Sequence, residues 1–214
     1  MGWLHRTRAW YVLAAVYTCV AVARLPRPLK PAALALRLAL VGASSASVWI
    51  SDGYHNPDVR GVGAAELPED ELSWLRLDYT SISMILSTNL WLWGSHLGWI
   101  GALRPLSKLS ALATALVATT AATIVPKRAG HIGIKLTLAV QFVGFLGYLV
   151  SVAAKSPIQA SIAVYLCYLP GFALYATKWP KTRTFGYHEY FHSSVLLGHL
   201  ASMGFDLAVL SAAL

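Results

Sequence analysis

The sequence predicts an all-α protein, a seven-transmembrane helix bundle that forms one domain over residues 1–214. Three observations favour this fold class. First, 57% of the residues are hydrophobic and only 12% are charged, which is far from the composition of a soluble domain. Second, seven apolar segments approach the length of a membrane span. Third, the net charge of +8 comes from basic residues that stand in small groups between these segments, as membrane flanks do, and not from the basic helix of a nucleic-acid-binding protein.

Each predicted helix is an apolar segment close to the roughly 17–25 residues that cross a bilayer. The segments are 9–23, 33–52, 78–101, 108–126, 132–152, 158–177 and 187–213. Connectors that contain proline or charge separate them, at 24–28, 104–105, 126–128, 155–157 and 178–181. The longest connector, 56–76, contains the stretch LPEDELSW, which is typical of a short surface helix that leads into the third span.

The first segment and the basic residues predict how the chain sits in the membrane. Arg6 and Arg8 precede the first segment, which ends in Ala21-Val22-Ala23, so a cleaved signal peptide is the alternative to a first span. Lys and Arg residues on the side of the N-terminus stand at 6, 8, 60, 76, 127, 128, 135, 178, 181 and 183; those on the other side stand at 24, 27, 30, 37, 104, 108 and 155. The positive-inside rule therefore predicts a multi-pass protein with a cytoplasmic N-terminus.

The last segment carries ionisable side chains on one face. At 100° per residue, four of them fall within about 40° of one another: His188, His192, His199 and Asp206. Ionisable residues inside a span are costly and usually face the bundle interior, where they pair, bind a ligand or conduct protons. This polar stripe is therefore predicted to face inward. For His199 we expect a hydrogen bond to Asp206 or Ser202, with a deeper metal-ligand role as the alternative.

Two further spans contribute polar groups near their ends. The second segment has polar residues three or four positions apart, namely Ser44, Ser47, Ser51 and His55. Ser44 and Ser47 are typical of small residues that allow two helices to approach closely. Ser51 and His55 stand at i and i+4, so a hydroxyl and an imidazole can point to one volume. Asp78 is predicted in the first turn of the third span, where capping and the helix dipole are the ordinary explanation for an aspartate.

The number of predicted spans implies that these groups lie on one side of the membrane. With seven spans, the end of the second, the start of the third and the start of the seventh are all on the side of the N-terminus. Three imidazoles (His55, His188, His192) and the carboxylate of Asp78 then share one depth. This is the set that a catalytic zinc site requires, and neutral imidazole suits the metal without adding buried charge. A pair of histidines at i and i+4 is by itself a weak signal, and the third imidazole and the carboxylate strengthen it.

At these residues the sequence resembles the haemolysin III / progestin and adipoQ receptor (PAQR) family, which is similar to the alkaline ceramidases in a wider group of seven-helix proteins. SDGYH (51–55) matches the S-x-x-x-H motif of helix two, and LDY (77–79) matches the start of helix three. FGYHEYFHSSVLLGH (185–199) matches the H-x-x-x-H motif of helix seven. Helix number and motif order agree over about residues 9–213.

The resemblance implies roles for five residues. It implies that His55, His188 and His192 bind Zn²⁺. It implies that Ser51 stabilises or positions the reacting centre, and that Asp78 holds the water on the metal.

A zinc-dependent lipid amide hydrolase of the ceramidase type is the first functional hypothesis. Zinc would activate a water, Asp78 would act as general base, and Ser51 would help to stabilise the oxyanion. The substrate would be a membrane lipid such as ceramide or another acyl amide. Three alternatives stay open: a receptor or membrane-organising protein in which the zinc is purely structural, a haem protein that uses His188 or His192, and a proton-coupled transporter built on the polar stripe.

Overall fold

The computed structural model describes residues 2–25, 31–55, 68–96, 103–122, 132, 134–143, 159–181 and 186–212. Every element in these ranges is an α-helix, which confirms the predicted all-α class. The chain divides into two compact units, Met1–Val143 and Gly144–Leu214, and each has its own internal packing.

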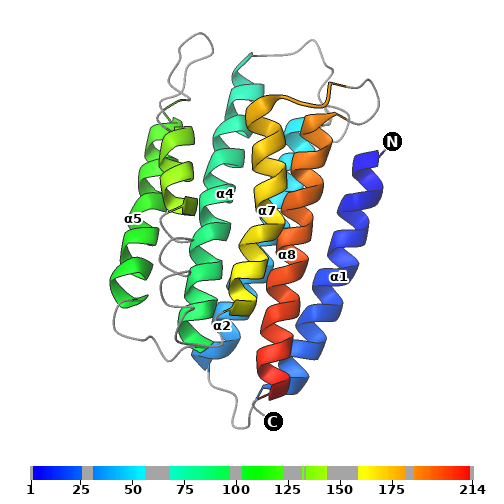
Figure 1. Ribbon diagram of the computed structural model, residues 1–214, viewed down its shortest axis with the longest axis vertical. Coiled ribbons are helices and arrows are strands. Elements are labelled where there is room, and N and C mark those ends of the chain that lie inside the picture. Colours follow the sequence, from blue (N-terminus) through cyan, green and yellow to red (C-terminus); the bar gives the residue numbers. More distant parts are fainter. Residues whose placement is uncertain are drawn as a thin grey trace. The chain divides into compact units, whose positions relative to one another are not determined.

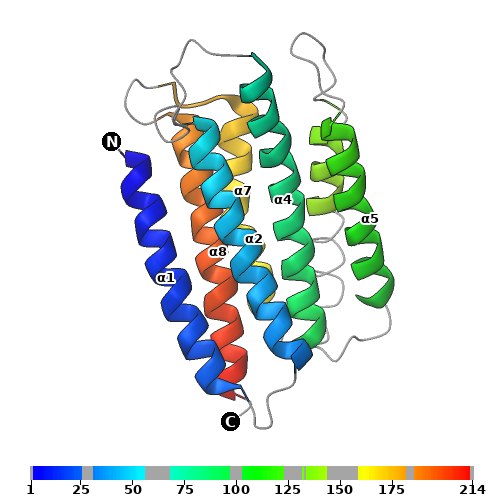
Figure 2. The same ribbon diagram turned by 180° about the vertical axis from the view of Figure 1, so that it is seen from behind.

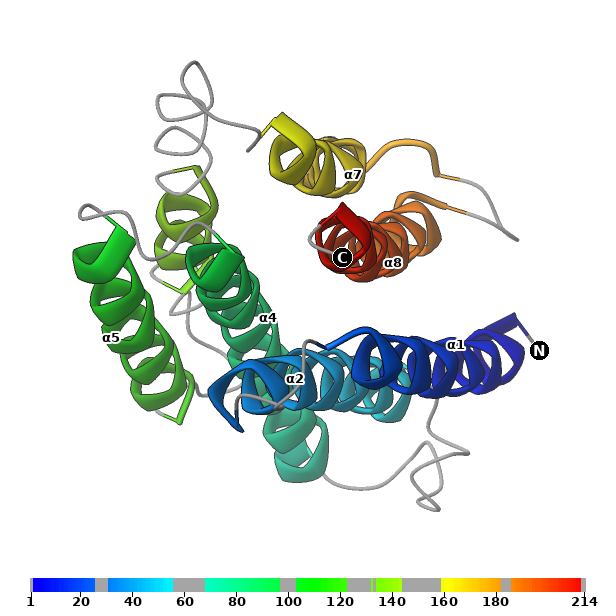
Figure 3. The ribbon, with the colours of Figure 1, turned by 90° about the horizontal axis from the view of Figure 1, so that it is seen from below.

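The first unit contains α1 (Gly2–Arg24), α2 (Pro31–His55), α4 (Pro68–His96), α5 (Leu103–Ala122) and the helical segment Ile134–Val143. Helices α1, α2, α4 and α5 pack in chain order, each against the next (Figures 1 and 2). Seen along the helices, α2 lies between α1 and α4 (Figure 3). Short connections favour such an arrangement, because consecutive helices then pack as antiparallel neighbours.

A network of hydroxyl and amide groups joins α4, α5 and the segment that follows them. The Ser83 hydroxyl donates to Gln141 Oε1 at 2.8 Å and lies 3.0 Å from the Thr114 hydroxyl. The Ser87 hydroxyl lies 2.8 Å from the same Thr114 hydroxyl and 3.3 Å from Gln141 Nε2. Ser110 also bonds to Ser87. These buried side chains satisfy one another's hydrogen-bonding groups. They lie in the same unit as an apolar cluster that consists of Val117, Ala121, Ile134 and Leu138.

Helix α4 begins earlier than the third predicted span. It is continuous from Pro68, so residues 68–74 of the stretch LPEDELSW form its first turns instead of a separate surface helix. Proline fits the first helical position because its missing N–H has no partner there in any helix. Asp78 consequently lies nearly three turns into α4. The prediction that Asp78 occupies the first turn is therefore wrong, and capping and the helix dipole, which act in the first turn, do not explain it.

The second unit is a helical hairpin of α7 (Gln159–Thr177) and α8 (Tyr187–Ala212), which lie side by side in Figures 1 and 3. Lys178 follows α7 with a φ of 52°, the left-handed conformation that ends many helices. The Glu189 carboxylate accepts a hydrogen bond of 2.8 Å from the Gly186 N–H. This is the reach-back contact of a capping box, and it defines where α8 begins.

Helices α7 and α8 approach each other closely at two glycines. A Cβ atom at Gly198 would lie 2.2 Å from a ring carbon of Tyr168, and one at Gly171 would lie 2.5 Å from the Cβ of Ser194. Both distances are too short for any other residue unless the neighbour moves. Small residues bring helix backbones together in this way in membrane bundles.

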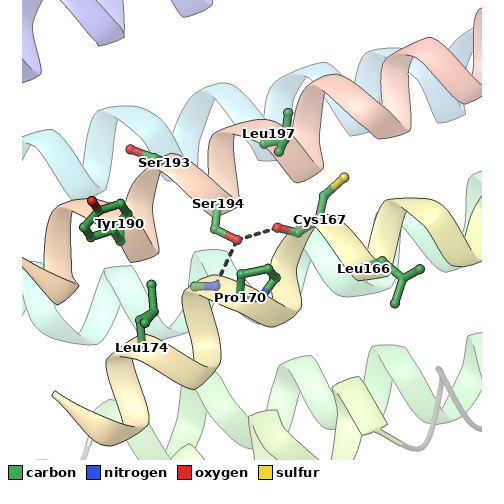
Figure 4. Close-up of a pocket in the computed structure, with 9 residues that line it drawn as sticks. Leu166, Cys167, Pro170, Leu174, Tyr190, Ser193, Ser194 and Leu197 are labelled. Carbon is green, nitrogen blue, oxygen red and sulfur yellow. Dashed lines mark hydrogen bonds between the residues drawn. The ribbon is translucent and has the colours of Figure 1, made fainter. Parts of the chain in front are cut away.

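A proline interrupts α7 where Ser194 of α8 contacts it. Pro170 has no N–H and so removes one bond from the backbone ladder. The Ser194 hydroxyl accepts a hydrogen bond of 3.1 Å from the Gly171 N–H and donates to the Cys167 carbonyl (Figure 4). A hydroxyl of the neighbouring helix therefore satisfies backbone groups beside the interruption, as is common in membrane helices.

Two helices in the described ranges are long and apolar enough to cross a membrane, Pro31–Gly53 and Tyr187–Ser211. Shorter apolar helices are Ala9–Arg24, Lys108–Thr119, Ile134–Val143 and Leu166–Thr177. Each of the seven predicted segments contains a helix in the structure. In the predicted segment 132–152, residues 144–152 lie outside the described residues.

Candidate metal-binding site

His188 and His192 face each other in the first two turns of α8. Their Nε2 atoms are 3.2 Å apart, and their ring centroids are 4.6 Å apart. Two imidazole nitrogens bound to one tetrahedral zinc at about 2.0–2.1 Å would be separated by about 3.3 Å. Without a metal, the same contact is a hydrogen bond in which one ring donates to the other. The two nitrogens are thus already spaced as two ligands of one ion.

Aromatic side chains surround this histidine pair. The Tyr175 ring of α7 lies 6.0 Å from the His188 ring and 5.0 Å from the Phe191 ring, measured between centroids. Phe191 in turn packs against His192 at 5.2 Å and against Phe172 at 5.4 Å. Both histidines are half-buried. The hairpin therefore restricts the rotamers of the pair by packing, which is how first-shell ligands are held in a fixed geometry.

Ser51 lies on a buried face near the end of α2. It is 7% exposed, and Ser44 and Ser47 of the same face are also buried. At this end of α2, Gly53 and Trp49 contact the Trp74 ring of α4. At 100° per residue, the direction of Ser51 is about 160° from that of Gly53. The burial of Ser44 and Ser47 agrees with the prediction that small residues there allow close helix approach.

Asp78 lies one turn beyond Trp74 on α4 and is half-buried. The hydroxyl of Ser81 donates to its main-chain carbonyl at 2.8 Å. Within the described ranges, no residue hydrogen-bonds or ion-pairs with its carboxylate. Because Trp74 contacts Gly53 at the end of α2, Ser51 and Asp78 lie at the same end of the first unit.

The predicted zinc ligands are divided between the two units. His188 and His192 lie together in the second unit, whereas Ser51, His55 and Asp78 belong to the first. His55 is the last residue of α2, and its side chain lies outside the described part of the chain. Among the side chains that the structure describes, no group of three or more His, Cys, Asp or Glu residues is placed to hold a metal ion.

The deeper part of the polar stripe on α8 is fully buried. His199 and Asp206 are 1% and 0% exposed, and Ser202 between them is also buried, so the inward orientation of the stripe is confirmed there. The Tyr168 hydroxyl lies 2.9 Å from His199 Nδ1. Tyr168 is a partner of His199 that the spacing of polar residues in the sequence does not predict. The signal for it is Gly198, which leaves room for the Tyr168 ring beside the histidine.

Comparisons with known proteins add no family assignment: no family model matches the chain, and no curated protein matches it.

Proposed function

We propose that the chain is a multi-pass membrane protein of seven spans with a cytoplasmic N-terminus, similar to the haemolysin III/PAQR family, and that it is a zinc-dependent lipid amide hydrolase of the ceramidase type. His55, His188 and His192 are the proposed zinc ligands. The observation that supports this proposal best is the 3.2 Å separation of the His188 and His192 Nε2 atoms.

The donor set fits zinc. His188 and His192 present two nitrogen atoms at the spacing of ligands on one tetrahedral ion. Neutral imidazoles bind Zn²⁺ without bringing further negative charge into an apolar helix hairpin. A third protein ligand from α2 would leave one coordination position open, as catalytic zinc sites do. When bound, zinc supplies Lewis-acid activation of a water molecule and of an amide carbonyl.

Asp78 and Ser51 are the proposed catalytic residues of the chain itself. A carboxylate that no described residue pairs with is available as a general base, so Asp78 takes a proton from the attacking water and passes it to the leaving amine. The Ser51 hydroxyl donates a hydrogen bond to the carbonyl oxygen as negative charge develops on it. Both groups lie at the same end of the first unit.

A membrane lipid is the proposed substrate. The histidines begin a helix that is long and apolar enough to span a membrane. If α8 crosses the membrane, histidines in its first two turns would lie near the membrane surface, close to the linkage between a lipid headgroup and its acyl chain. An amide at that position, as in ceramide, would reach the site without leaving the bilayer.

Metal analysis followed by a hydrolysis assay tests the proposal. Zinc is measured in purified wild type and in the variants His55→Ala, His188→Ala and His192→Ala, and ceramide hydrolysis is measured on the same samples. Ser193→Ala is the matched control, because its hydroxyl bonds to the Glu189 carbonyl of its own helix. We expect zinc and activity in wild type and control, and loss of both in the three histidine variants.

Two results would change the assignment. Zinc retained in the histidine variants would refute the site. Zinc that is lost in those variants, together with no hydrolysis by the wild type, would favour a receptor or membrane-organising protein with a purely structural metal.

A further inference from the structure

A groove of about 430 Å³ runs along the α7–α8 hairpin. Its lining is almost entirely apolar and comes from both helices (Figure 4): Leu166, Cys167, Pro170, Gly171, Leu174, Tyr190, Ser193, Ser194 and Leu197. The volume is within the range of pockets that hold small ligands. The buried residues of its lining are Gly171 and Ser194, which form its floor where α7 and α8 approach closely.

The groove is on the opposite face of α8 from the histidine pair. At 100° per residue, Tyr190 and Leu197 lie about 140–180° from the directions of His188 and His192. A ligand in the groove would therefore be distinct from the substrate of the proposed zinc site. The inference depends on α8 crossing a membrane and does not depend on the zinc.

The surroundings of the groove indicate its occupant. Leu166, Leu197 and Tyr190 on its rim are exposed, at 53%, 54% and 42%. On a helix that is long and apolar enough to cross a membrane, exposed leucines at this depth face lipid hydrocarbon. We propose that the groove holds one acyl chain of a bilayer lipid, with the lipid headgroup beside Tyr190 near the start of α8.

The shape and polarity of the groove favour an acyl chain over a second copy of the helix hairpin. Close helix pairs need small residues at the contact, whereas the rim of this groove consists of leucines and a tyrosine. The small residue of the floor, Gly171, is already covered by Ser194. The Ser194 hydroxyl also satisfies the Gly171 N–H and the Cys167 carbonyl, so these polar groups of the floor do not need water. A thin, flexible and apolar chain fits such a channel.

Photolabelling in vesicles tests this inference. The full-length protein is placed in phosphatidylcholine vesicles that contain a lipid with a diazirine in its acyl chain, and labelled peptides are mapped after illumination. Leu197→Trp fills the groove from α8 and Leu174→Trp fills it from α7. Leu116→Trp is the matched control, because Leu116 on α5 has the same exposure of 54% as Leu197 and lies outside the groove.

We expect the peptides of α7 and α8 that line the groove to carry the strongest label in wild type. Each groove variant should reduce that label at least about threefold, because a tryptophan would occupy much of the available space, and the control should leave it unchanged. Equal labelling of groove and control surfaces in wild type would overturn the proposal, as would unchanged labelling in both groove variants. Crosslinked dimers in place of lipid adducts at Leu197 would show that a second copy occupies the groove.

Discussion

The two units of the molecule both bury polar side chains, but they use them differently. In the first unit, hydroxyl and amide groups around Gln141 bond to one another across three helices. In the second unit, His188 and His192 bring two nitrogen atoms to a single point near a helix start. Polar groups that hydrogen-bond to one another make the packing of the helices specific, and few of their donors and acceptors remain to bind a ligand. The Nε2 atoms of these two imidazoles are spaced as two ligands of one ion would be.

The way the helices are held together also differs between the units. The second unit relies on close backbone approach at Gly171 and Gly198, supported by the Ser194 and Tyr168 bonds. This packing places aromatic rings around the histidine pair. The hairpin is therefore closely packed where the proposed ligands are, and the polar network of the first unit has a structural role. The predictions below test this division of roles.

The largest effect on the rate of hydrolysis is expected when Asp78 of the first unit is replaced. Asp78→Asn keeps the size of the side chain and removes its basicity, so ceramide hydrolysis should fall by about 10²–10⁴-fold. Zinc content should stay the same, because the metal is assigned to imidazoles. The rate is measured with Thr80→Ala as the control, whose hydroxyl bonds to the Arg76 carbonyl of its own helix. A rate within a few-fold of wild type would exclude Asp78 as the base.

Substitutions in the second unit should affect zinc affinity more than any other property. His188→Ala or His192→Ala should weaken zinc binding at least about 100-fold, since loss of a ligand should cost more than the 10–100-fold of a lost outer-shell partner. Competition with a chelator measures the affinity. Gln141→Leu in the first unit should leave zinc affinity unchanged. If Gln141→Leu weakened zinc as much as a histidine variant, the separation of roles between the units would not hold.

Glycine substitutions compare a crowded and an open position on the same helix. Gly198→Ala should destabilise the protein by about 1–3 kcal/mol, because the added methyl group meets the Tyr168 ring. Gly204→Ala meets nothing within 4 Å and should be neutral or stabilising by up to about 1 kcal/mol. Thermal unfolding in detergent micelles measures both. Equal stability of the two variants would mean that α7 and α8 are not held by close approach at Gly198.

The smallest effect is expected in the polar network of the first unit. Gln141→Leu removes the amide that bonds to Ser83 and Ser87, and should cost about 0.6–1.7 kcal/mol, the range measured for hydrogen bonds between membrane helices. Thr119→Ala is the control, because its exposed hydroxyl bonds to carbonyls of its own helix. Its effect should stay within about 0.5 kcal/mol. A larger loss for Thr119→Ala than for Gln141→Leu would contradict a stabilising network.

Hydropathy was sufficient to predict where the helices are. Apolar runs bounded by proline and charge predict α2, α7 and α8 to within about three residues at each end. The acidic stretch after Pro68 was predicted to be helical, but as a separate surface helix, because it has no apolar periodicity that joins it to the third span; its continuity with the rest of α4 was not predicted. This error also affected the interpretation of Asp78.

Only the part of the candidate site that lies on one helix could be predicted, from the spacing of its residues. Positions i and i+4 predict that His188 and His192 face each other, and the structure confirms it. The aromatic partners of the pair come from α7, as does Tyr168 beside His199, and their alignment depends on where Gly171 and Gly198 allow the helices to meet. Such contacts between helices are set by packing, which a single sequence does not display.

Zinc K-edge X-ray absorption of the purified protein tests the central claim most directly. For wild type, three histidine ligands predict a nitrogen or oxygen shell at about 2.0–2.1 Å, with the outer scattering of imidazole rings. The double variant His188→Ala/His192→Ala should lose this signal. A zinc-free wild-type protein prepared without chelators, or a sulfur shell at about 2.3 Å, would contradict the claim that these imidazoles bind the metal.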